Sequence, residues 1–160
     1  NEMFSADSNS SMDFNGDIGS WDVSSVTNMT WMFYRATKFN QEINKWDVSK
    51  VKNMAAMFNY ATSFNQNIGD WDVSKVTNMS SMFRNATLFD QNINDWDVSQ
   101  VTDMSNMFHS ATDFNQNLSA WNVERIKSEP RDFKKNANSK WKNNYQPQWG
   151  LSAADRAAAL

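Results

Sequence analysis

A 25-residue repeat is the feature that most constrains the fold of this chain. Tryptophan recurs at this interval at Trp21, Trp46, Trp71, Trp96 and Trp121. The shared pattern is W-D-V-S-x-V-x-N/D-M-x-x-M-F-x-x-A-T-x-F-N/D-Q, and it recurs without insertion or deletion. A unit this short cannot bury its apolar face alone, so successive units are expected to stack around one continuous core.

Two different spacings of apolar residues alternate inside each unit. The segment 68–73 reads Ile-x-x-Trp-x-Val, which is the strand spacing of leucine-rich repeats. The next apolar residues follow the i, i+3, i+4, i+7 spacing of one helix face, at Met79, Met82, Phe83 and Ala86. Asn78 precedes them and is a good N-cap residue. Each unit is therefore expected to form a strand, a short helix and a turn.

The predicted fold class is an α/β solenoid, a leucine-rich-repeat-like stack of strand, short helix and turn with a parallel sheet on one face. Residues 1–20 are expected to form a degenerate N-terminal repeat or cap, with Met3-Phe4 as a displaced Met-Phe pair. Four repeats fill residues 21–120, and residues 121–150 are expected to cap the stack. Residues 151–160 end in Ala-Ala-Ala-Leu and have the composition of a non-native cloning tail.

The expected core is aromatic and rich in methionine. Leu and Ile are scarce, whereas the chain has 8 Trp, 10 Met and 11 Phe residues. Each buried aromatic side chain removes roughly 150–250 Å² from water, so these residues can supply the missing apolar area. The predicted core positions are Trp46, Trp71, Trp96, Met79, Met82, Phe83 and Phe89.

Charge and composition exclude several classes of function. The formal net charge is -3, so the chain lacks the basic field of a nucleic-acid-binding protein. No run of apolar residues approaches the roughly 18 that a membrane-spanning helix needs. The chain has no cysteine, which excludes disulfides and thiolate metal ligands. No motif indicates a cofactor.

The repeat resembles that of BspA-like leucine-rich-repeat proteins, a family rich in bacterial surface lipoproteins. The residues that carry the resemblance are 71–93, W-D-V-S-K-V-T-N-M-S-S-M-F-R-N-A-T-L-F-D-Q-N-I, and the end segment with Pro130, Phe133 and Pro147-Gln-Trp-Gly150. The resemblance implies a cell-surface or extracellular location and a role in adhesion. It carries over no catalytic residue.

One column, meaning a set of equivalent positions in successive units, consists of carboxylates. It contains Asp22, Asp47, Asp72 and Asp97, and Asn122 completes it. One hypothesis is a cation-binding face, which makes these aspartates weak candidates for metal ligands. The other is that each Asp accepts hydrogen bonds from the nearby serine hydroxyl or from the turn backbone. The recurrence of Asp-Val-Ser favours the second hypothesis, and one Asp per unit supplies few of the 6–8 oxygens that Ca²⁺ takes.

Two further polar columns have both a structural and a functional interpretation. Asn15, Asn40, Asn65, Asp90 and Asn115 could form a binding strip or an amide ladder that satisfies backbone groups, and we favour the ladder. The threonines at 37, 62, 87 and 112 could form an ice-binding row. Hydroxyls bonded to carbonyls four residues back are the plainer interpretation.

The sequence offers no constellation for catalysis. His109 is the only histidine, and its equivalents in the other units are Tyr34, Asn59 and Arg84. Serine is plentiful, but no motif places a base beside it. We therefore expect that this chain is not an enzyme. Trp31 is the one tryptophan of the repeats that is expected to be exposed.

The expected function is protein binding or adhesion on the exposed sheet face. Candidate contact residues are Lys45, Asp70, Asp72, Asp95 and Asp97, and their acidity suggests a basic patch on the partner. Such a partner would be a host, matrix or neighbouring-cell protein, bound by a monomer. The alternatives are a structural spacer within a larger surface protein and a cation- or ice-binding surface.

Overall fold

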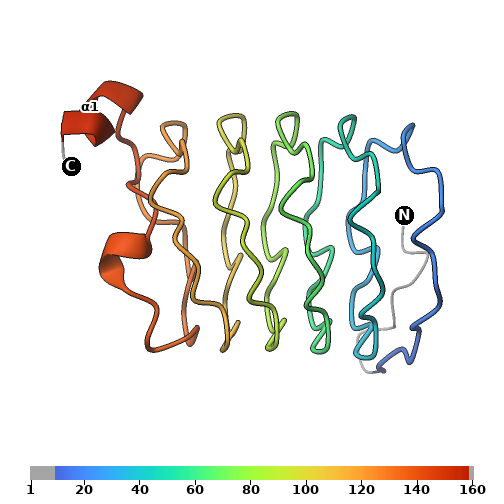
Figure 1. The fold of residues 1–160 in the computed structure, drawn as a ribbon. Helices are drawn as coiled ribbons and strands as arrows, with labels where there is room; N and C mark the ends of the chain where they lie inside the picture. The colour runs from blue at the N-terminus through green and yellow to red at the C-terminus, as the bar shows by residue number, and fades with distance from the viewer. Residues whose placement is uncertain (1–9, 159–160) are drawn as a thin grey trace.

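The chain forms a row of similar coils stacked side by side. The computed structural model describes residues 10–158, so the predicted Met3-Phe4 pair lies outside the described part. Figure 1 shows the coils edge-on, with the first at one end of the row and the short C-terminal helix at the other. Each coil contains one 25-residue unit, so equivalent residues of successive units lie beside one another.

Regular secondary structure is nearly absent from residues 10–158. The described helices are η1, a 3₁₀ helix at Asn143–Tyr145, and α1 at Ala153–Ala158. Strand pairing is limited to three isolated parallel bridges, Asn28 with Asn53, Asn53 with Asn78, and Asn78 with Asp103. The predicted α/β solenoid of leucine-rich-repeat type, with a parallel sheet and short helices, is therefore wrong.

The segments predicted as strands are turns. In unit 2 the N–H of Trp46 donates to the carbonyl of Ile43 at 3.2 Å, and the N–H of Val51 donates to the carbonyl of Val48 at 2.9 Å. A bond across four residues closes a β-turn, so the chain reverses between Ile43 and Trp46. The spacing Ile-x-x-Trp therefore marks the two ends of a turn.

The segments predicted as helices are pairs of consecutive β-turns. In unit 1 the N–H of Met32 donates to the carbonyl of Met29, and the N–H of Ala36 donates to the carbonyl of Phe33. In two successive four-residue turns, the first and last residue of each turn point inward. Counted from the start of the first turn, these are positions 1, 4, 5 and 8. A helix face has the same spacing, so the apolar pattern could not distinguish the two backbones.

The third residue of each of these turns has a left-handed backbone. Type II turns require positive φ at this position, which usually selects glycine. Here ten non-glycine residues have φ between 52° and 61°, among them Trp31, Arg35, Ala56 and Ser81. Such a conformation costs an L-residue roughly 1–2 kcal/mol. Interactions between coils must offset this cost.

Backbone hydrogen bonds between coils supply part of that compensation. Alternate N–H groups of the paired turns donate to the next coil, as from Met29, Trp31, Phe33 and Arg35 to the carbonyls 24 residues later. The same bonds recur in units 2 and 3, at distances of 2.8 to 3.0 Å. Each coil therefore holds its neighbour along the whole double turn.

The core consists of aromatic columns that run the length of the stack. Phe33, Phe58, Phe83 and Phe108 stack with ring centroids 5.5 to 5.8 Å apart and nearly parallel planes. A second column, Phe39 to Phe114, repeats at 5.9 Å. Aromatic pairs of this geometry add about 0.5–1.5 kcal/mol each beyond the area they bury.

The tryptophan column connects the coils through a polar contact as well. The indole N–H of Trp46 donates to the carbonyl of Ile18 in the preceding coil at 3.0 Å. Trp71, Trp96 and Trp121 repeat this bond to Ile43, Ile68 and Ile93. The indole N–H is thereby satisfied inside the core, as a buried donor requires.

The last coil ends the stack through a shift of one residue. In units 1 to 3 the backbone N–H groups donate to carbonyls 24 residues later. In unit 4 they donate to carbonyls 25 residues later, as from Phe108 to Phe133 at 2.8 Å. The turn from Pro130 to Phe133 corresponds to the turn from Met104 to Met107 in unit 4. The next residue, Lys134, therefore stands where Phe108 stands in unit 4. The Phe33–Phe108 column cannot continue past this lysine, and Phe133 and Trp141 cover its end edge-on.

Candidate functional site

The Asp column closes turns on the surface of the stack. Oδ1 of Asp22 accepts hydrogen bonds from the N–H and the hydroxyl of Ser24 at 3.0 and 2.6 Å. Asp72 accepts the same pair from Ser74, and Asp47 and Asp97 accept the N–H of Ser49 and Ser99. One carboxylate oxygen in each unit is therefore used by the fold.

These bonds also keep the carboxylates charged. Hydrogen bonds from the following serine lower the pKa of Asp22, Asp47 and Asp72, with smaller contributions from Lys50 or Lys75. Within residues 10–158, no three His, Cys, Asp or Glu side chains gather as a metal site would need. The Asp column thus places charge at the surface at regular intervals.

The predicted contact residues lie together on this surface, which we call the Asp face. It comprises positions 45, 47, 70, 72, 95 and 97, all exposed. Lys50 and Lys75 are also exposed and lie close enough to lower the pKa of neighbouring aspartates. The face therefore has mixed charge. The predicted set omitted these lysines, although their positions, three residues after Asp47 and Asp72, are visible in the sequence.

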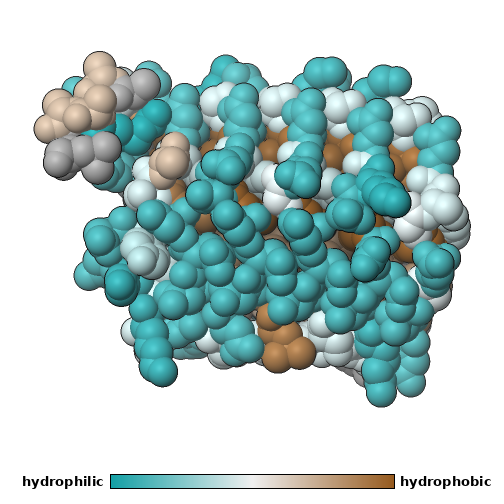
Figure 2. Space-filling model, in the orientation of Figure 1, coloured by the Kyte–Doolittle hydropathy of each residue, from teal (hydrophilic) through white to brown (hydrophobic). Residues whose placement is uncertain are grey.

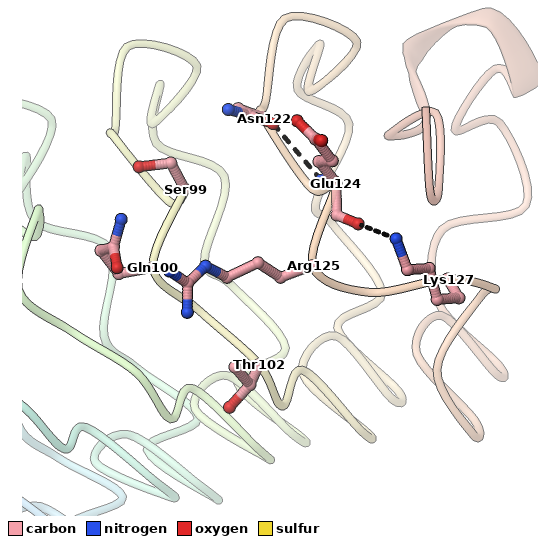
Figure 3. A pocket seen from close by; sticks show the side chains of 7 residues that line it. All are labelled: Ser99, Gln100, Thr102, Asn122, Glu124, Arg125 and Lys127. Carbon is pink, nitrogen blue, oxygen red and sulfur yellow. Dashed lines mark hydrogen bonds between the residues drawn. The ribbon is translucent and has the colours of Figure 1, made fainter. Parts of the chain in front are cut away.

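An open groove of about 720 Å³ lies between the last two coils. Figure 3 shows Arg125 extending across it toward Gln100, with Glu124 and Lys127 on the far wall. The backbone carbonyl of Glu124 accepts a bond from Nζ of Lys127 at 3.3 Å. The residues that line the groove are polar and charged, which is typical of a water-filled surface groove and not of an apolar ligand pocket.

The Asn column forms the amide ladder. Oδ1 of Asn40 accepts the N–H of Asn65 and the side-chain amide of Gln66 in the next coil, at 2.9 and 3.0 Å. Asn15, Asn65 and Asp90 repeat these contacts. Their polar groups are used between coils, so this column has little left for a ligand.

The threonine column also connects coils. The hydroxyl of Thr87 donates to the carbonyl of Thr62 at 3.3 Å, and Thr62 and Thr112 make equivalent bonds. These carbonyls lie 25 residues back, so the predicted bond to a carbonyl four residues back is wrong. Hydroxyls that bond across the stack are not presented as a row to water.

A different surface carries the most variable side chains. The corners of the paired turns correspond to positions 30, 31, 34 and 35 of unit 1, and we call these positions in the four units the turn face. Trp31 is exposed, Ala56 and Asn59 are buried, and the other side chains of the turn face are half-buried. Trp31 is 48% exposed, the highest value among the tryptophans of the described residues. Figure 2 shows how hydrophilic ridges recur along one side of the stack with apolar surface between them.

Three side chains of the turn face form an aromatic–cation cluster. The guanidinium carbon of Arg35 lies 4.8 Å from the ring centroid of Tyr60 and 5.6 Å from that of Tyr34. Nε of Arg35 donates to the hydroxyl of Tyr34 at 3.2 Å, and the two rings meet edge-on. Sequence reasoning missed this cluster, although its residues stand at variable positions between fixed columns.

Polar atoms without partners gather on the same face. Oδ1 of Asn59, Nε of Arg84 and Nδ2 of Asn85 are buried and have no hydrogen-bond partner. Asn59 as a whole is 8% exposed. Farther along, burial and the neighbouring Arg84 lower the pKa of His109, which favours its neutral form. Unpaired buried polar groups are uncommon in folded proteins and need an explanation.

Comparison with known families gives one match. The family model described as "Mycoplasma protein of unknown function, DUF285" matches residues 1–75 and again residues 66–158. The chain belongs to this family. No curated protein and no solved structure matches it. The match does not test the BspA-like resemblance, which stays a prediction.

The family match extends into the segment predicted to be a cloning tail. Residues 153–158 form α1, and Ser152 accepts the N–H of Asp155 at its N-terminus. Arg156 donates to Oδ1 of Asn122 at 3.0 Å, which joins the helix to the last coil. In the part of the chain that the structure describes, no helix is long and apolar enough to cross a membrane.

Proposed function

We propose that this DUF285 chain is a non-catalytic protein-binding module at the cell surface or outside the cell, and that the turn face is its contact surface. One observation carries the proposal. Side chains at the constant positions use their polar groups within the stack, as Asn40 and Trp46 do, whereas the turn face varies from unit to unit. On repeat scaffolds such varying surfaces serve binding.

The composition of the turn face supports a protein partner. Trp31, Tyr34, Arg35 and Tyr60 belong to the three residue types that dominate binding energy at protein interfaces. Arg35 is held by two rings, so little side-chain entropy remains to be lost on binding. The surface location rests on the BspA-like resemblance of the repeat.

A structural spacer is the second candidate function. The hydrogen bonds and ring stacks between coils continue without a break from unit 1 to unit 4, as a rigid rod would need. A spacer would not need the exposed Trp31 or the unpaired atoms of the turn face. We therefore favour the binding module.

The experiment is a binding titration against an array of purified extracellular-matrix proteins. The turn-face variant combines Trp31→Ser, Arg35→Asn and Arg84→Asn, which are the residues at the same positions in other units (Ser81, Asn85 and Asn59). The Asp-face variant combines Asp70→Asn, Asp72→Asn, Asp95→Asn and Asp97→Asn. We expect the turn-face variant to lose binding by tenfold or more while both variants keep the melting temperature within a few degrees.

The two variants separate the outcomes. Loss only in the Asp-face variant would move the contact surface to the Asp face and support a basic partner. Binding to no protein in the array by the unaltered chain would favour the spacer.

A further inference from the structure

The turn face has one sign of charge. Positions 30–35 of the four units contain two cationic side chains, Arg35 and Arg84, a histidine whose lowered pKa favours its neutral form, His109, and no carboxylate. Neither of the two ion pairs found among residues 10–158 involves them, because both lie in the last coil at Lys134 and Lys135. This surface contrasts with the Asp face, where five aspartates lie among the lysines at positions 45, 50 and 75.

Arg35 is arranged to bind an acceptor. Its Nε is used by the hydroxyl of Tyr34, and the rings of Tyr34 and Tyr60 fix the guanidinium plane. The two terminal nitrogens make no hydrogen bond within the described residues. A guanidinium held in this way presents a planar fork of donors that matches a carboxylate.

Two units along the stack, a second set of donors lacks acceptors. Nε of Arg84 and Nδ2 of the adjacent Asn85 are unpaired, and Oδ1 of Asn59 in the preceding coil is unpaired as well. Because donors outnumber acceptors here, a ligand that supplies oxygen acceptors would satisfy this set best. A small reorientation of Arg84 would be needed, since these atoms are covered in the free chain.

We propose that the turn face binds an acidic segment of a partner polypeptide, with one carboxylate at Arg35 and another at Arg84. The inference rests on the proposed function and names the chemistry of the partner. Coils are separated by roughly one strand spacing of about 4.8 Å, so two coils span about 10 Å. An extended peptide covers that distance in about three residues.

A sulfated polysaccharide fits this face less well. Such polymers select dense clusters of basic residues. The densest cluster of this chain lies in the last coil and beyond, at Lys134, Lys135, Lys140 and Lys142. The turn face instead offers two fixed guanidinium groups among aromatic rings, which is the composition of a protein interface.

The test is a fluorescence titration with a labelled peptide of ten glutamates, alongside ten glutamines and a heparin octasaccharide. The test variant combines Arg35→Asn and Arg84→Asn. Each arginine is replaced by the asparagine that stands at the same position of another unit, Asn85 and Asn59. The control variant combines Arg125→Gln and Lys127→Thr, which are the residues at the same positions of the preceding unit, Gln100 and Thr102. It removes two positive charges as well, but from the groove. We expect the first variant to weaken glutamate binding roughly tenfold and to flatten its salt dependence, and the control to change affinity less than twofold.

Other results would overturn the acidic-segment inference. An equal loss in the control variant would mean that net charge alone is responsible. Glutamine binding as strong as glutamate binding would exclude carboxylate recognition, and an equal loss of heparin binding would identify a general polyanion site. If the matrix-protein titration succeeds through the turn face while ten glutamates do not bind, the acidic ligand is wrong and the proposed function stands.

Tyr60→Asn tests whether ring contact positions Arg35. This change should weaken glutamate binding severalfold while leaving its salt dependence intact, because both charges remain. Tyr60→Phe keeps the ring and should bind as the unaltered chain does. Equal affinities for both Tyr60 variants and the unaltered chain would remove the positioning role.

Discussion

The four repeated units and the last coil use the same residue types in different geometries. Inside the repeats, neighbouring rings are parallel, as in the pair Phe58 and Phe83 at an interplanar angle of 4°. At the last coil, Phe133 and Trp141 meet Phe108 at 84° and 73°. A parallel column leaves an open face for the next ring, whereas edge-on rings close it. The stack therefore grows by repetition and ends by a break in register.

The largest effect is expected from removing a ring inside the repeats. Trp96→Ala deletes a side chain that is stacked on Trp121 and bonded to Ile68, so unfolding should become about 3–5 kcal/mol easier. Trp149→Ala, at the partly exposed end, should cost clearly less. Chemical denaturation of both variants measures the difference, and equal losses would contradict the view that the repeats hold most of the stability.

A somewhat smaller effect is expected at the last coil. Phe133→Ala should destabilise the chain by about 2–4 kcal/mol, because Phe133 is buried against Phe108 and Trp149. Phe133→Met restores the residue that the repeats have at this position and should cost less than about 1.5 kcal/mol. Melting curves compare the two. A Met variant as unstable as the Ala variant would show that edge-on closure needs an aromatic ring.

The amide ladder should contribute less than the rings. Asn65→Ala leaves the N–H of Asp90 without its acceptor, at a cost of about 1–3 kcal/mol, whereas the amide of Gln91 keeps its bond to the backbone carbonyl of residue 65. Asn65→Asp should be nearly neutral at pH 7, since Asp90 fills this place in the next unit. Denaturant midpoints provide the measurement, and loss of stability in the Asp variant would count against the ladder as drawn.

Glycine substitutions at the left-handed turn positions should raise the stability of the chain, unlike the substitutions above. Ser81→Gly relieves a φ of 57° and should stabilise the chain by about 0.5–1 kcal/mol after the added flexibility of the unfolded chain is counted. Ser81→Val should destabilise it, because a β-branched residue resists positive φ. The same pair at Asp132 extends the test to the last coil. A destabilising Gly at both positions would refute type II turns.

The smallest effect on stability is expected from protonation of the column aspartates at low pH. The pKa of Asp72 is below its ordinary value of 3.8 because Ser74 donates to the carboxylate, as it is for Asp22 and Asp47. This stabilisation is present above the unfolded pKa and is lost as pH falls through the lower folded pKa. Replacing the three with Asn, the residue at position 122, should reduce the fall in melting temperature between pH 5 and 2. An unchanged fall would show that other groups govern acid unfolding.

Part of the site could be predicted from fixed positions in the sequence. The Asp-Val-Ser pattern favoured a turn with Asp as acceptor, and Oδ1 of Asp72 accepts from Ser74 as such a turn requires. The turn-face cluster could not be predicted in this way. Arg35 and Tyr60 hold the same position in successive units, but the residue type at this position changes from unit to unit, so no repeated pattern marked the pair.

The repeat period and the set of inward side chains follow from the order of residues alone. The spacing of Met79, Met82, Phe83 and Ala86 predicts that these side chains share one side, and all four are buried. The tertiary structure decided the backbone. The N–H groups of Met79 and Ser81 donate to the carbonyls of Asp103 and Ser105 in the next coil. Those bonds exist only in the stack, so local spacing could not distinguish turns from strands and helices.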